Sequence, residues 1–207
     1  MTRRLIQLNW GLALYGMSIG LMVRANLGLN PWDVFHQGLS ELTGLSLGTT
    51  IIIIGAAVLL FWIPLRQRPG IGTIANVFLI GIWSDVSLWL IPHASSLALA
   101  WAMLLGGIFL NGVAGGAYIG AGLGPGPRDG LMTGLVKRTG KSVRLIRTGI
   151  EIIVVAAGWM LGGTLGLGTV LYALAIGPLV HRMLPLFTIE ESVQPSLAAA
   201  RCCAQPR

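Results

Sequence analysis

The sequence predicts an all-α polytopic membrane protein with six transmembrane helices and two short re-entrant half-helices, built as a 3+3 inverted-topology repeat. Three observations carry this prediction. The 207-residue chain is 54% hydrophobic and only 10% charged, whereas soluble domains carry about 25% charged residues. Two Gly- and Pro-rich breaks recur 96 residues apart. The Lys and Arg residues fall almost entirely on one side of the predicted topology, as the positive-inside rule requires.

Six segments are long enough to cross a bilayer, because a span needs about 20 apolar residues in a helix. They are 5–23, 45–64, 71–91, 97–120, 144–163 and 167–187. Two further segments, 31–43 and 127–139, have thirteen residues each and would extend only about 20 Å, so we expect half-helices.

The predicted domain is a single transmembrane unit, residues 1–187. It consists of a first repeat over 5–91 and a second repeat over 97–187. We expect 188–207 to be a flexible cytoplasmic tail.

The repeat is visible in the residues themselves. Segments 27–46 and 123–142 share nine of twenty positions without a gap. The same offset continues into the flanking spans, where Gly16 matches Gly112 and Gly72 matches Gly168. Each half contains three crossings, which is an odd number, so the second copy must lie upside down relative to the first.

Loop charges test this topology independently. With the N-terminus inside, thirteen of the fourteen Lys and Arg residues fall on the cytoplasmic side, and Arg24 is the exception. If 31–43 crossed the bilayer fully, Arg66 and Arg68 would move outside. The positive-inside rule therefore favours half-helices, with both termini cytoplasmic.

Each break is suited to start a helix. Pro31 fits a first helical turn, Asn30 can cap it, and Asp33 follows at the third helical position. The equivalent residues of the second half are Gly126, Pro127 and Asp129. We expect the two helix N-termini to approach each other near the midplane and to line a binding site or pore for a polar or anionic solute.

The predicted substrate or ion pathway combines both breaks with polar residues of the spans. Its members are Gly28, Asn30, Pro31, Asp33, Gly124, Gly126, Pro127, Arg128, Asp129, Glu151, Asn76 and Asn111. Asp33 and Asp129 serve either as helix caps or as proton-binding carboxylates. Glu151 either pairs with Arg147, one turn earlier, or carries a coupling proton.

Other classes of function find no support in the sequence. The Gly124-Pro125-Gly126 run lacks the preceding strand and the GK[ST] ending of a phosphate-binding loop. No arrangement typical of nucleophilic catalysis or of a metal site occurs, so we expect no enzyme, cofactor or metal. The net charge of +7 indicates cytoplasmic loops, and we expect no nucleic-acid partner.

A family resemblance adds to this interpretation. The Leu-Gly-x-x-Pro-Trp-Asp stretch at 27–33, the Gly-Pro-Gly-Pro-Arg-Asp-Gly-Leu run at 124–131 and the Gly-x-Gly-Thr openings of the third spans resemble the YczE/YyaS/YitT family of bacterial integral membrane proteins. The resemblance covers 5–187, and the second run resembles the YczE branch. It implies a multi-pass protein of the bacterial inner membrane, sometimes classed with small-molecule or drug exporters. It supplies no catalytic residues.

We therefore expect a secondary transporter that exports a small polar, anionic or drug-like solute by alternating access, with proton coupling through Asp33, Asp129 or Glu151. The alternatives are a passive channel for a small neutral or anionic solute and a non-transporting regulatory or assembly partner. The expected partners are the lipid bilayer, the solute and a coupling proton. The sequence leaves open whether the unit is a monomer or a homodimer.

Overall fold

In a computed structural model, which describes residues 1–189, the chain is all-helical, as the sequence predicts. The eight helices are α1 (Thr2–Ala25), α2 (Pro31–Thr43), α3 (Leu47–Trp62), α4 (Ile71–Leu90), α5 (Leu97–Gly120), α6 (Pro127–Thr139), α7 (Val143–Met160) and α8 (Leu167–Phe187). From residue 190 onward, the predicted tail lies outside the described residues.

Local sequence sets the helix boundaries. The side chains of Ser46, Ser96 and Ser142 each accept a hydrogen bond from the backbone N–H three residues on, so that they cap α3, α5 and α7. Gly44 and Gly140 end α2 and α6 with φ of 72° and 67°, a left-handed conformation that favours glycine. The two half-helices therefore begin at a proline and end at a glycine in equivalent positions.

Helix length and composition support several bilayer crossings. Four helices, α1, α4, α5 and α8, are long and apolar enough, and a fifth span results if α2 and α3, which meet at 114°, form one bent segment. Helix α3 has only 16 residues, and α7 contains Arg144, Arg147 and Glu151 within 18 residues. The chain is thus a polytopic membrane protein, and the six separate spans stay a prediction.

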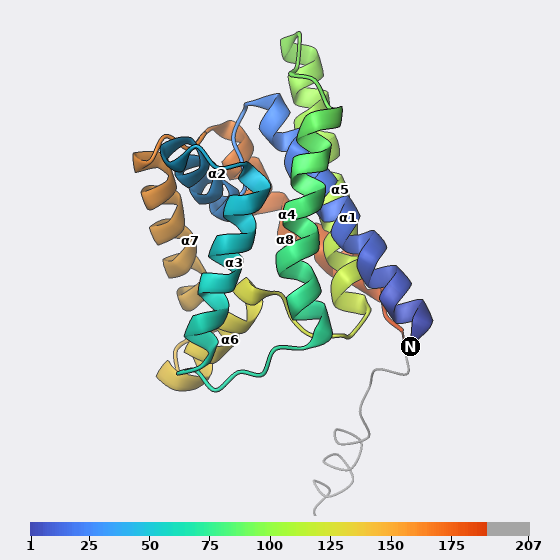
Figure 1. The fold of residues 1–207 in the computed structure, drawn as a ribbon, viewed down its shortest axis with the longest axis vertical. Helices are drawn as coiled ribbons and strands as arrows, with labels where there is room; N and C mark the ends of the chain where they lie inside the picture. Colours follow the sequence, from blue (N-terminus) through green and yellow to red (C-terminus); the bar gives the residue numbers. More distant parts are fainter. Residues whose placement is uncertain (190–207) are drawn as a thin grey trace, which may run out of the picture.

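Among the long helices, α1 packs against α4 and α5, and α5 packs against α8. The four shorter helices lie to one side of α4 and α1 in Figure 1. Glycines allow the long helices to approach closely. Gly16 of α1 leaves no room for a side chain against Trp83 of α4. The equivalent Gly112 of α5 does the same against Leu179 of α8, where an added Cβ would lie 2.7 Å from the leucine Cβ.

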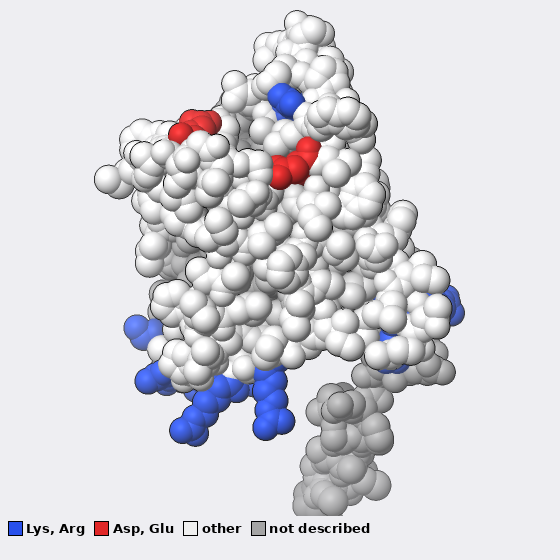
Figure 2. Space-filling view, viewed as in Figure 1, with Lys and Arg blue, Asp and Glu red and all other residues white. Residues whose placement is uncertain are grey.

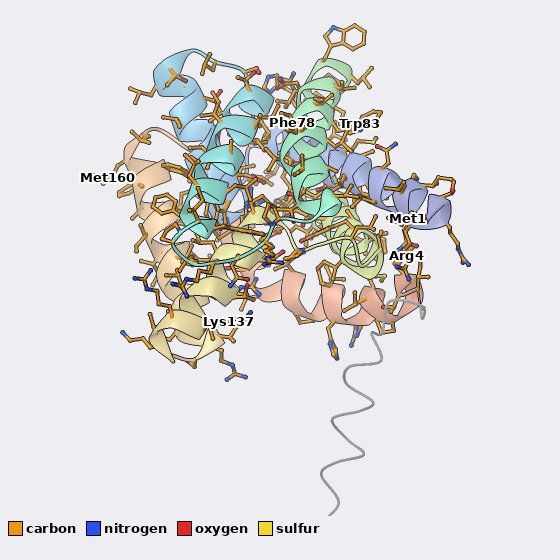
Figure 3. All side chains as sticks on the ribbon, turned by 60° about the horizontal axis from the view of Figure 1, so that its bottom comes forward. Met1, Arg4, Phe78, Trp83, Lys137 and Met160 are labelled. Atoms are coloured by element: carbon orange, nitrogen blue, oxygen red, sulfur yellow. The ribbon has the colours of Figure 1, made fainter. Side chains whose placement is uncertain are left out.

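The surface divides into zones along the long axis. Figure 2 shows Lys and Arg side chains gathered at the lower end of this face and a broad uncharged zone above them. An uncharged zone bounded by basic loops is typical of a membrane-embedded surface. In the turned view of Figure 3, Arg4 of α1 and Lys137 of α6 both project from that end, while Met160 lies at the opposite end of α7.

The two halves differ in one respect. Helix α3 packs along α4, but the equivalent helices α7 and α8 have at most a marginal contact and lie apart in Figures 1 and 3. Helix α3 buries six of its 16 residues, whereas α7 buries only Gly158 among its 18. The first half is therefore closed between these helices, and the second half is open.

Candidate functional site

The first break is held by the opposite half of the molecule. Gly28 has φ of 120°, and an added Cβ there would lie 2.8 Å from the backbone nitrogen of Thr169. The preceding carbonyl, that of Leu27, accepts a hydrogen bond of 2.8 Å from Gly168 N, in the first turn of α8. This bond satisfies a carbonyl that the break exposes and an N–H that the helix N-terminus exposes.

The second break repeats this geometry. Gly124 has φ of 124°, and Leu123 O accepts a 2.9 Å hydrogen bond from Gly72 N in the first turn of α4. Thr73 adds a hydroxyl bond of 2.8 Å to Pro125 O. Each break is thus tied to a long helix of the other half. At both glycines an added Cβ would press against backbone and a threonine hydroxyl at the start of a long helix, which indicates a structural role for both glycines.

The first turn of α2 surrounds a buried carboxylate. The Asn30 side chain accepts hydrogen bonds of 3.0 Å from the backbone N–H groups of Trp32 and Asp33. Its amide also donates to the Asp33 carboxylate. The other carboxylate oxygen lies 3.2 Å from His36 Nδ1. Asp33 is completely inaccessible to solvent, so these partners replace the water that its charge would otherwise bind.

The first turn of α6 has a different environment. Gly126 begins it without a side-chain cap, and the Asp129 carboxylate accepts a 2.7 Å hydrogen bond from Tyr118 OH. Trp62 donates from its indole nitrogen to Pro127 O at 3.0 Å and covers Gly130, where an added Cβ would lie only 1.9 Å from an indole carbon. Asp129 is only partly buried, in contrast to Asp33.

The two first turns meet through equivalent residues. The Arg128 guanidinium carbon lies 5.0 Å from the centre of the Trp32 ring, which is cation–π distance. One guanidinium nitrogen lies 3.5 Å from Asp33 Oδ1 and 3.5 Å from His36 Nδ1. The second half thus supplies a cation to the buried carboxylate of the first half. Trp32 and Arg128 lie 96 residues apart, the offset of the sequence repeat.

Two cavities flank this contact. The first cavity, about 80 Å³, lies among α1, α3, α4 and the half-helices, and the second cavity, about 140 Å³, faces α7 and α8. Both are lined by Tyr15, Trp32, Arg128 and Asp129. Asn76, Gly126 and Pro127 line the first, whereas Asn30, Pro31 and Glu151 line the second. The two cavities therefore adjoin at the Trp32–Arg128 contact, and each combines apolar walls with a few polar side chains.

A third cavity, about 340 Å³, extends between α5 and α8. On its wall, Tyr172 OH donates to Asn111 Oδ1 at 2.9 Å, and the Asn111 amide donates to Ser18 Oγ at 2.7 Å. Arg147 also lines this cavity and is bound to Glu151 at 2.9 Å. The predicted pairing of these two residues, one of the two roles considered for Glu151, is present in the structure.

The structure brings most of the predicted pathway residues together. Eight of them line the first or second cavity, and Asp33 lies behind this lining in contact with Arg128. The eight are Asn30, Pro31, Asn76, Gly126, Pro127, Arg128, Asp129 and Glu151. Asn111 lines the third cavity. Gly28 and Gly124 line none of the three.

Sequence reasoning missed Tyr15, Trp32 and the α7–α8 opening. Tyr15 lies within an apolar span and carries no local signal. One feature of the sequence could have identified Trp32 as a site residue, namely that it occupies the position equivalent to Arg128 in the repeat. His36, which the predicted pathway does not include, lies buried against Asp33. Among residues 1–189 no group of three or more His, Cys, Asp and Glu side chains could hold a metal ion.

Comparison with known proteins assigns the family. Residues 2–185 match a family described as a family of unknown function, DUF6198, and the chain belongs to it. The "Uncharacterized membrane protein YczE" of Bacillus subtilis is 37% identical over 172 residues, which is 83% of this chain and 80% of that protein. An "Uncharacterized protein" of Haemophilus influenzae is also 37% identical over 172 residues, or 83% of this chain and 79% of that protein.

A more distant relative is the "Uncharacterized protein YyaS" of Bacillus subtilis, 24% identical over 180 residues, or 85% of this chain and 90% of that protein. No solved structure matches the chain. These relatives confirm the family resemblance predicted from the two breaks.

Proposed function

We propose that the protein is a secondary transporter that exports a small polar, anionic or drug-like solute by alternating access around the two half-helices. In this proposal six spans and two re-entrant half-helices form an inverted repeat in the bacterial inner membrane. Both termini are cytoplasmic. The paired hydrogen bonds Leu27 O–Gly168 N and Leu123 O–Gly72 N support the repeat, because they join equivalent atoms. The basic lower end in Figure 2 supports the orientation.

One observation carries the proposal. Two cavities that contain polar and charged side chains share the Trp32–Arg128 contact as part of their lining. Alternating access needs a solute site that communicates with one side at a time, and a wall contributed by both halves can open when the halves move relative to each other. The open α7–α8 pair beside the closed α3–α4 pair fits one of two interchangeable states.

The same geometry disfavours the two alternatives. A passive channel needs a continuous polar path, and here the cavities are separated by stacked and ion-paired side chains. A purely regulatory or assembly protein has no need for cavities with charged side chains at the breaks. Asp33, Arg128 and Asp129 at this place therefore favour a solute pathway over an assembly role, because charges inside a membrane are costly and mark such pathways.

Transport can be tested with purified protein in liposomes and a panel of neutral, anionic and cationic solutes, with and without a pH gradient. We expect saturable flux of at least one solute that depends on the gradient. Replacing Asp33, Asp129 and Glu151 with Asn or Gln, one at a time, should weaken the dependence on pH in at least one case. Asp85→Asn is the matched control, because Asp85 binds Ser46 and Gly48 at the start of α3, outside these cavities.

Gradient-independent, non-saturable flux would favour the channel. Absence of flux for every solute, with protein shown to be folded, would favour the assembly role. Undiminished proton dependence in all three carboxylate variants would remove proton coupling through these residues from the proposal.

A further inference from the structure

The opening between α7 and α8 forms a groove in the wall of the molecule. This lateral groove has a volume of about 530 Å³, and Ile152, Val155, Val170 and Leu174 supply much of its surface. Ile152 and Leu174 are 63% and 70% exposed, so the groove is open to the surroundings. In a membrane protein these surroundings are the hydrocarbon chains of lipids.

The groove leads toward the half-helices. Its inner lining includes Pro31, the first residue of α2, and Glu151, and both residues also line the second cavity. The second cavity in turn shares Arg128 and Asp129 with the first. Apolar surface on the outside is therefore followed by polar groups on the inside.

Of the acidic side chains along this route, Asp129 is the one that has no ion-pair partner within residues 1–189. Arg128 is paired with Asp33 at 3.5 Å, and Arg147 is paired with Glu151 at 2.9 Å. Within residues 1–189, Asp129 has no cationic side chain within 4.0 Å and accepts a hydrogen bond from Tyr118. The N-terminus of α6 supplies only about half a positive charge. A carboxylate with surplus negative charge thus faces the cavities.

Aromatic rings surround the same carboxylate. Tyr15 lines all three cavities together with Asp129, and the Tyr15 and Tyr118 rings meet edge to face at 6.1 Å. Tyr172 and Trp32 complete the aromatic lining of the second cavity. Ring faces attract cations most strongly where water is scarce. Arg128 already occupies the Trp32 face, which leaves the tyrosines for a ligand.

We propose that this site binds a hydrophobic organic cation, which enters from the lipid through the lateral groove and places its positive charge near Asp129 among the tyrosines. This inference rests on the proposed transport function and specifies its substrate class. It selects a cation where the helix N-termini alone would favour an anion. The apolar part of the ligand occupies the groove between α7 and α8.

Three probe ions separate the contributions of charge and apolar surface. Tetraphenylphosphonium is a hydrophobic organic cation, tetraphenylborate is an anion of nearly the same shape, and tetramethylammonium is a cation without a large apolar surface. Binding to the full chain in lipid nanodiscs can be measured by calorimetry, with empty nanodiscs subtracted. We expect saturable binding of tetraphenylphosphonium, and binding of the other two ions about tenfold weaker or more.

Variants locate the charged group. Asp129→Asn should weaken tetraphenylphosphonium binding about tenfold or more, and Asp129→Glu should restore most of it. Asp85→Asn should leave binding unchanged. Equal binding of tetraphenylborate, or unchanged binding in Asp129→Asn, would overturn the proposed site.

A matched pair of variants tests entry through the groove. Ala156 lines the groove on α7, whereas Ile153, on the same helix, is 70% exposed and does not line it. Ala156→Phe should slow tetraphenylphosphonium association about tenfold, as followed by stopped-flow quenching of tryptophan fluorescence, and Ile153→Phe should not. Equal association rates in the two variants would exclude this entry route.

The outcomes also separate this inference from the transport proposal. If liposomes show saturable flux of other solutes but the chain binds no tetraphenylphosphonium, the substrate class is wrong and transport stands. If tetraphenylphosphonium binds at Asp129 but no solute of the panel crosses, the site stands and transport is wrong.

Discussion

The two halves of this protein are most alike at their breaks and least alike at the helices that follow. At the breaks, Gly28 and Gly124 have nearly the same φ, and each is preceded by a carbonyl bound to the first turn of a long helix. At the following helices, α3 packs along α4, whereas α7 stands away from α8. The backbone geometry of the breaks is thus duplicated, whereas the packing of the helices that enclose the cavities differs between the two halves.

A reciprocal exchange of large and small residues shows how the walls diverged. Where α3 crosses α6, Trp62 covers Gly130; where α7 crosses α2, Gly158 lies against Val34, at equivalent positions. An added Cβ at Gly158 would lie 2.6 Å from the Val34 carbonyl carbon. Each crossing is closely packed, but only the first contributes an indole that binds Pro127 O. The same fold can therefore be kept with different packing on each side.

The largest effect is expected at the Trp62 crossing. Trp62→Ala should lower the free energy of unfolding by about 3–5 kcal/mol, because it leaves a cavity over Gly130 and an unbound Pro127 carbonyl. Unfolding can be measured by steric trapping in bicelles. The double variant Trp62→Gly/Gly130→Val copies the other crossing. Its loss of unfolding free energy should be smaller than the sum of the losses in the two single variants. A loss equal to that sum would show that the two positions do not compensate for each other.

The two equivalent carboxylates should respond differently to neutralisation. Asp33→Asn leaves the Arg128 charge without its partner, so we expect a loss of about 3 kcal/mol in unfolding free energy. Asp129→Asn should cost less than about 1 kcal/mol, because Asp129 is partly exposed and its hydrogen-bond donor is a neutral tyrosine. The same unfolding assay compares both variants, and equal losses would refute the assigned difference in environment.

The two glycines of the breaks should respond alike. Gly28→Ala and Gly124→Ala force a side chain into a left-handed conformation, which should cost about 2 kcal/mol each. Gly149→Ala is the control, because an added Cβ at Gly149 of α7 meets nothing within 4 Å. Thermal unfolding in detergent, followed by intrinsic fluorescence, is sufficient to rank the variants. A large effect at only one break would show that the duplicated geometry is not equally important in both halves.

The smallest effect is expected on the open side. Arg147 and Glu151 form an i,i+4 pair whose side chains are 52% and 31% exposed. A double-mutant cycle with alanine should give a coupling energy below about 0.5 kcal/mol in detergent. A coupling several times larger would show that the pair is buried by lipid or by closure of α7 on α8.

Much of the fold could be predicted because its boundaries are marked locally. Proline at the start and glycine at the end placed the two half-helices at 31–43 and 127–139, and the structure has the same bounds. The i,i+4 spacing also indicated an Arg147–Glu151 pair as one of two roles for Glu151, and the pair is present. Such signals depend only on neighbouring residues.

The rest depends on contacts between distant segments. Trp32 is an ordinary apolar residue by type, and it becomes part of the site only because α6 brings Arg128 onto its ring. Neither the sequence of α7 nor that of α8 indicates by itself that the two helices lie apart. The surplus charge at Asp129 could not be recognised before the partners of Asp33 and Glu151 were known.

The two hydrogen bonds at the breaks can form only in a fixed order while the chain is being synthesised. Leu123 O finds its partner, Gly72 N, in chain that the ribosome has already made. Leu27 O must wait for Gly168 N, which is synthesised 141 residues later. At about 5–20 residues per second this interval lasts about 7–28 s. During translation Leu27 O therefore lacks this hydrogen bond until α8 has been made, and the last helix of the described residues completes the first break.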